Sequence, residues 1–125
     1  MAEIHEIYNT RQTEPGVKRR WFTDSDYWDL YIWEDPGGNM NSFQLCYNRG
    51  YTDEKALTWK KTGNYRHNSV NSTASWGKAK TDVLSQRESL DNTKIYDSFQ
   101  RDSKVLEIKY REFILRKIRE YENPA

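Results

Sequence analysis

The chain has 125 residues, 35% of them hydrophobic and 14% aromatic, and its 20 Lys and Arg nearly balance its 19 Asp and Glu, leaving a formal charge of +1. Because a nearly neutral chain repels itself little, the large aromatic side chains can build a core that the few aliphatic residues could not build alone. The composition therefore excludes a strongly polyionic or disordered chain and favours one domain over residues 1–125.

The sequence predicts neither a signal peptide nor a membrane span. Its N-terminal residues, MAEIHEIY, lack a basic stretch followed by an apolar run, and no window is apolar enough to cross a bilayer. The single cysteine, Cys46, cannot form an internal disulfide. We therefore expect a cytoplasmic location and no membrane partner.

Residues 17–70 consist of short aromatic runs separated by turn residues, which is typical of an antiparallel meander. The clearest reversal is Asp35-Pro36-Gly37-Gly38-Asn39, and shorter turns are expected at 48–50 and 62–64. An edge strand is predicted within Glu3–Gln12 and a last strand at Lys78–Leu84. The main predicted strands are Val17–Thr23, Tyr27–Glu34, Ser42–Asn48, Lys55–Lys61 and Asn64–Val70.

The C-terminal part, within about 91–122, has the pattern of two helices. Ile95 and Phe99 lie four residues apart, and a second apolar set recurs at helical spacing: Leu106, Tyr110, Phe113, Ile114, Ile118 and Tyr121. Asp91 and Asn92 can cap the first helix, and Asp102-Ser103 predicts a break and a second cap. The fold class predicted is α+β, a twisted antiparallel sheet, mainly a meander, with the C-terminal helices packed on one face.

Alternation within the strands assigns side chains to the two faces of this sheet. One face is predicted to form the core under the helices, with Trp28, Leu30, Ile32, Phe43, Leu45 and Leu57. The other mixes aromatic and polar groups, which suits a ligand or a protein partner, or a second modest core under a loop. Its candidate binding residues are Tyr31, Trp33 and Cys46, with Lys60 at the rim.

The sequence shows no pattern typical of a metal or cofactor site. His5, His67 and Cys46 lack metal-ligand spacing, and phosphate-binding glycine motifs do not occur. Asp24-Ser25-Asp26 resembles the start of a calcium loop, but Asp29 stands where that loop requires Gly, so we expect a polar connection. No cofactor is predicted.

Two further functions stay open beside a binding module. Cys46 and His67 are the only conceivable thiol and imidazole pair for a small enzyme on the aromatic face, although a lone cysteine in an apolar strand is usually a buried hydrophobe. The segments 18–21 and 60–67 interleave cations with aromatic rings, as weak single-stranded nucleic-acid binding would require. Five acidic residues within 24–35 would repel phosphates, so nucleic acid is the less favoured partner.

Four short motifs resemble a small prokaryotic family of uncharacterised proteins. They are Arg19-Arg20-Trp21-Phe22, Asp29-Leu30 with Trp33, Phe43-Gln44-Leu45-Cys46-Tyr47 and Ala56-Leu57-Thr58-Trp59. The resemblance spans Arg19 to Trp59 and implies a shared fold without any chemistry, so it assigns no catalytic or binding residue.

Ile108 and Leu115 lie away from the main helical stripe and predict one of two arrangements. Either they form a seam for a weak homodimer, or the first helix folds back to cover them within a monomer. Taken together, the sequence favours a non-enzymatic module that binds a small molecule or a protein.

Overall fold

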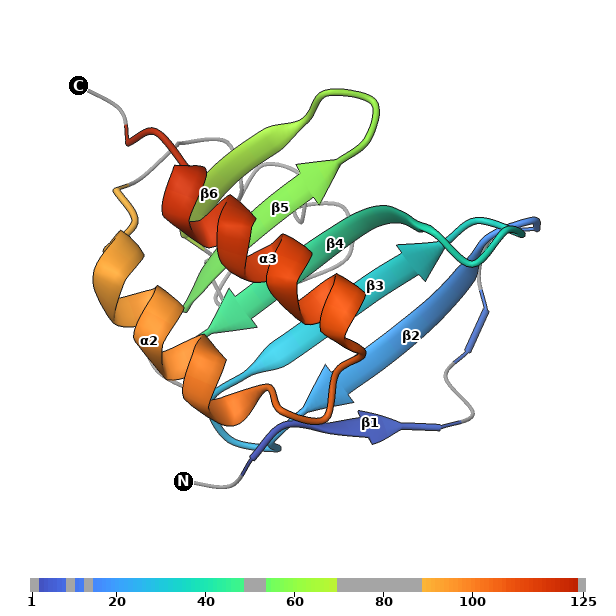
Figure 1. Ribbon diagram of the computed structural model, residues 1–125, viewed down its shortest axis with the longest axis horizontal. Helices are drawn as coiled ribbons and strands as arrows, with labels where there is room; N and C mark the ends of the chain where they lie inside the picture. The colour runs from blue at the N-terminus through green and yellow to red at the C-terminus, as the bar shows by residue number, and fades with distance from the viewer. Residues whose placement is uncertain (1–2, 9–10, 13–14, 49–53, 70–88, 124–125) are drawn as a thin grey trace.

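The computed structural model describes residues 3–8, 11–12, 15–48, 54–69 and 89–123 (Figure 1). Its strands form one open antiparallel sheet in the order β1-β2-β3-β4-β5-β6, and two helices follow, so the predicted α+β meander is confirmed. The predicted strand at Lys78–Leu84 lies outside the described residues. The strands are β1 (His5–Ile7), β2 (Lys18–Thr23), β3 (Asp29–Glu34), β4 (Met40–Tyr47), β5 (Lys55–Lys60) and β6 (Tyr65–Ser69), and the helices are α2 (Asn92–Asp102) and α3 (Ile108–Glu120).

Two turns between described strands follow from their sequences, whereas the turn expected at 48–50 extends beyond the described residues. After β3, Asp35 Oδ1 accepts hydrogen bonds from the backbone N–H groups of Gly37 and Asn39, and Gly38 takes a φ of +83°. The β5–β6 hairpin closes where the Lys60 N–H donates to the Asn64 carbonyl, with Gly63 at a φ of +119°. Such positive φ values favour glycine, which is why these positions could be recognised as turns.

Helix α2 begins as predicted, and its break from α3 also falls where expected. The Asp91 carboxylate caps α2 by accepting from the Lys94 N–H, and α2 ends at Asp102. The predicted second cap at Asp102-Ser103 is wrong, because α3 begins five residues later, at Ile108. The buried Asp102 carboxylate instead accepts a hydrogen bond from the Trp28 indole at 2.9 Å, which joins α2 to the start of β3.

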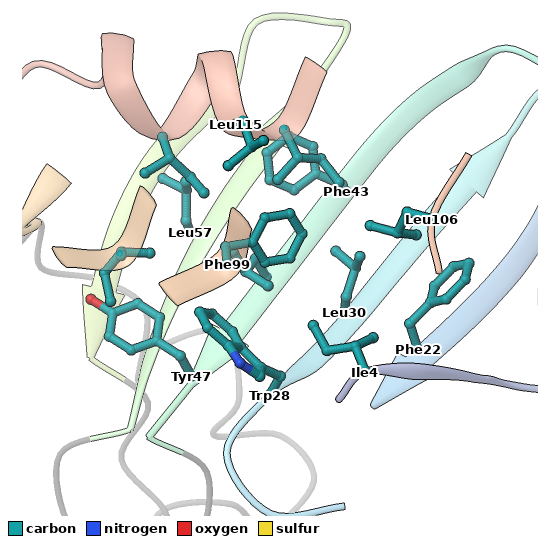
Figure 2. Close-up of a cluster of buried hydrophobic side chains, with 14 of the residues drawn as sticks. Ile4, Phe22, Trp28, Leu30, Phe43, Tyr47, Leu57, Phe99, Leu106 and Leu115 are labelled. Atoms are coloured by element: carbon teal, nitrogen blue, oxygen red, sulfur yellow. The ribbon is translucent and has the colours of Figure 1, made fainter. Parts of the chain in front are cut away.

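Both helices lie across the same face of the sheet (Figure 1), and the hydrophobic core fills the space between this face and the helices. The six predicted sheet core residues are all completely buried: Trp28, Leu30, Ile32, Phe43, Leu45 and Leu57. In Figure 2, Phe99 of α2 points at Trp28, and their rings meet edge to face with centroids 5.5 Å apart. The alternation in the sequence therefore identified the inner face correctly.

The two apolar residues of α3 that lie outside the main stripe, Ile108 and Leu115, differ in burial because α2 packs beside α3. Leu115 is 5% exposed and belongs to the core, whereas Ile108 remains 74% exposed. The expected seam of Ile108 with Leu115 is therefore wrong, because Leu115 is covered within its own chain. The alternative, in which the first helix folds back and covers these residues within the same chain, is correct for Leu115.

Candidate functional site

The candidate site lies on the far face, by which we mean the side of the sheet turned away from α2 and α3. Cross-strand register places side chains from β2 to β5 in adjacent rows on this face. The middle row runs from Trp21 through Tyr31 and Gln44 to Thr58. The next row, toward the β3–β4 turn, runs from Arg19 through Trp33 and Ser42 to Lys60.

Three half-buried aromatic rings are packed side by side on the far face. Tyr31 lies 6.0 Å from Trp21 with their planes only 9° apart, and 6.0 Å from Trp33 at 32°. The Arg19 guanidinium sits over the Tyr31 ring at 5.5 Å, and the Asp29 carboxylate accepts from the Trp21 indole N–H at 2.9 Å. These contacts fix the ring planes, so the row is a preformed surface.

A small hollow of about 150 Å³ adjoins this aromatic row at Trp33. The register places Trp33 of β3 opposite Ser42 of β4, and Ser42 opposite Lys60 of β5, so three strands contribute to it. The register then shifts between Trp33 and Glu34, which leaves Asn41 without an opposite residue on β3. The hollow is lined by Val17, Trp33, Asn41, Ser42, Lys60, Lys61 and Thr62.

The structure brings three of the four predicted site residues together. Tyr31 and Trp33 are in ring contact, and Lys60 shares the hollow with Trp33. Cys46 occupies the same face but lies four residues along β4 from Ser42, which is about 13 Å along an extended strand. The thiol is therefore outside the hollow, at the other end of the far face.

His67 does not lie on the aromatic face, contrary to the enzyme alternative. Its register partner is Leu57 of the core, and its side chain is completely buried under the helices. Its ring Nε2 hydrogen-bonds the Tyr47 hydroxyl at 2.7 Å, and Tyr121 of the C-terminal segment packs against the same ring. Because Cys46 faces the opposite side of the sheet, the two cannot act as a thiol and imidazole pair.

Two acidic residues of segment 24–35, Asp24 and Glu34, do not lie on the far face. Asp24 is buried in the β2–β3 connection, where its Oδ1 accepts from the N–H groups of Asp26, Tyr27 and Trp28, so this segment is the expected polar connection. Glu34 points to the helix side and binds Arg20. The carboxylates of Asp24 and Glu34 therefore do not repel a phosphate at the far face, whereas that of Asp29 lies on this face, where it accepts from the Trp21 indole.

Arg20 forms the largest ionic cluster in the described part of the chain, on the helix side of β2. It pairs bidentately with Glu6 at 2.9 Å, with Glu34 at 3.1 Å and with Glu107 at 2.7 Å. The hydrogen bonds that the Arg20 guanidinium donates, first to Glu6 and then to Glu107 and Glu34, raise the pKa of Arg20. Burial, with a hydrogen bond to Glu34, likewise raises the pKa of Tyr110, which keeps its hydroxyl protonated as a donor.

Sequence reasoning missed several residues of the site. Trp21 continues the aromatic row, and Ser42, Asn41 and Lys61 complete the hollow. Trp21 could have been found, because side chains alternate between the two faces along a strand. Trp21 shares the face of Arg19, two residues away, and points opposite to the adjacent Phe22, which is buried in the core. The hollow could not, because it depends on a register shift that no sequence pattern marks.

Comparisons with protein-family models, with curated proteins and with solved structures find no match to this chain. The resemblance to the uncharacterised prokaryotic family stays an expectation. Among the residues that the structure describes, no three His, Cys, Asp or Glu side chains are grouped so that they could hold a metal ion. Neither of the described helices has the length and apolar character needed to cross a membrane.

Proposed function

We propose that the protein is a non-enzymatic binding module that holds its ligand on the far face of the sheet, against Trp33. The observation that supports this function is the hollow, which is lined by the Trp33 ring on one side and by two lysines, Lys60 and Lys61. A flat ring can stack on the indole while a polar or anionic substituent meets the lysines and the Ser42 hydroxyl.

The size of the hollow limits what it can hold. Pockets for drug-sized ligands usually enclose about 300–1,000 Å³, whereas this hollow encloses about 150 Å³. Only one ring or one small group of a ligand fits inside, and the remainder has to lie along the aromatic row of Tyr31 and Trp21. An extended ligand therefore suits this surface better than a compact one.

A nuclear magnetic resonance titration tests this function. The five Trp indole N–H signals are recorded while three probes are added separately: adenosine monophosphate, a chito-oligosaccharide and an aromatic tetrapeptide. The Trp33 signal is identified by its loss in Trp33→Ala. We expect at least one probe to shift it, and no such shift at millimolar concentration of any probe would contradict the proposal.

The variants separate binding from folding. Trp33→Ala should keep its circular dichroism spectrum and lose the binding, while Tyr8→Ala, which removes an aromatic ring that is 75% exposed and outside the hollow, should bind as the wild type does. Unfolding of Trp33→Ala would indicate instead that the far face is a second buried layer. In that case Lys60→Gln, at an exposed position, carries the same test.

A further inference from the structure

The far face combines stacked aromatic rings with an excess of positive charge, although the whole chain carries a formal charge of only +1. The alternation of side chains along β2 puts the charges on different faces of the sheet. Arg20 points to the helix side, where Glu6 and Glu34 neutralise it. Arg19, its neighbour, turns to the far face. The local field that a ligand meets therefore differs from the one that the composition suggests.

Cations outnumber carboxylates among the far-face positions of the paired strands. Arg19 and Lys60 occupy the two ends of the row that contains Trp33, and Lys61 follows Lys60 at the hollow. In β2 to β5, the carboxylate on this face is that of Asp29, which is engaged by the Trp21 indole. The residues lining the hollow include no carboxylate.

The ligand chemistry that matches these features is a flexible polyanion with flat rings. Bases of a single strand can stack on aromatic side chains whatever their sequence, and each phosphate between them needs a cation within reach. The hollow admits one ring at a time, which suits one nucleotide of a longer strand. A duplex presents its bases already stacked on each other and cannot offer a free ring face.

We propose that the far face binds single-stranded nucleic acid, with one base against Trp33 in the hollow and the adjacent phosphates at Lys60, Lys61 and Arg19. This inference rests on the proposed binding function and names its ligand. Binding of this kind depends on backbone charge and stacking, so it should show little preference for sequence and a strong dependence on salt.

The test is fluorescence anisotropy with a labelled twelve-nucleotide oligothymidylate at 50 and 200 mM salt. We expect saturable binding that weakens at the higher salt, together with weaker binding of a duplex of equal length. Trp33→Ala should weaken binding about 5- to 100-fold through the lost stacking. Lys60→Gln with Lys61→Gln should weaken it and lower the slope of log affinity against log salt by about 0.7 for each phosphate contact removed.

Lys94→Gln with Lys104→Gln is the matched control, because it also removes two positive charges, from exposed positions in α2 and in the α2–α3 connection, outside the far face. Equal effects of this control and of the Lys60 and Lys61 changes would overturn the inference. Binding that heparin replaces equally well, with no effect of Trp33→Ala, would also overturn it, since charge alone would then account for it. If the oligothymidylate does not bind while another probe shifts the Trp33 signal, the ligand assignment fails and the binding function stands.

Discussion

The Arg20 cluster allows a prediction of stability from its geometry. Replacing Arg20 with Met keeps the apolar stem but removes the charge shared by Glu6 and Glu34, whose side chains are only 14% and 13% exposed. Breaking a fully buried ion pair costs about 3–5 kcal/mol, because the remaining charge stays buried without a partner. Some water reaches these carboxylates, so we expect the lower end, about 3 kcal/mol. Glu107 is 47% exposed and adds little.

Urea unfolding followed by circular dichroism measures this loss. For a slope of about 1.5 kcal/mol per molar urea, a loss of about 3 kcal/mol lowers the midpoint by about 2 M. The control is Arg19→Met, the same change at the next residue, where the guanidinium lies over Tyr31 and donates to the Arg11 carbonyl. We expect that control to cost about 1 kcal/mol or less.

A double-mutant cycle with Glu6→Gln then isolates the bidentate pair. Because Arg20 and Glu6 are in direct contact, their effects should be coupled by about 1–3 kcal/mol. The reasoning is refuted if Arg20→Met costs no more than Arg19→Met, or if the cycle shows additive effects. Either result would mean that water stabilises the charged carboxylates of Glu6 and Glu34 as well as the Arg20 guanidinium does.

Three further predictions follow from the packing. Leu45→Ala removes a completely buried side chain and should cost about 2–5 kcal/mol in the same urea titration, whereas a cost below about 0.5 kcal/mol would show that the sheet faces are inverted. The hydrogen bond from Arg101 holds the pKa of Asp102 below its usual range, so the stabilisation is complete above about pH 4 and is lost as the pH falls through the lowered pKa. Asp102→Asn should therefore flatten the fall in urea midpoint below about pH 4, and an unchanged profile would contradict this. Leu115→Glu should unfold the chain, while Ile108→Glu should change neither stability nor the mass measured by light scattering; a folded Leu115→Glu would place that residue at the surface.

Within the described residues, the sequence alone determined which strands and helices form and which sheet face is apolar. The alternation of Trp28, Leu30 and Ile32 has the period of a strand, and the spacing of Ile95 and Phe99 has the period of a helix. Both patterns are local, because a side chain's direction within one element is fixed by the backbone geometry of that element. Tyr31 and Trp33 could for the same reason be assigned to the far face.

Only the tertiary structure decided which distant groups meet. Arg20 binds carboxylates that are 14 and 87 residues away in the sequence. Lys60 and Trp33 line the same hollow because the register of the strand between them, β4, places them in one row. Leu115 is buried because α2 packs beside α3, which the pattern of α3 by itself does not contain. Register and helix packing depend on the free energy of the whole core, so no local pattern determines them.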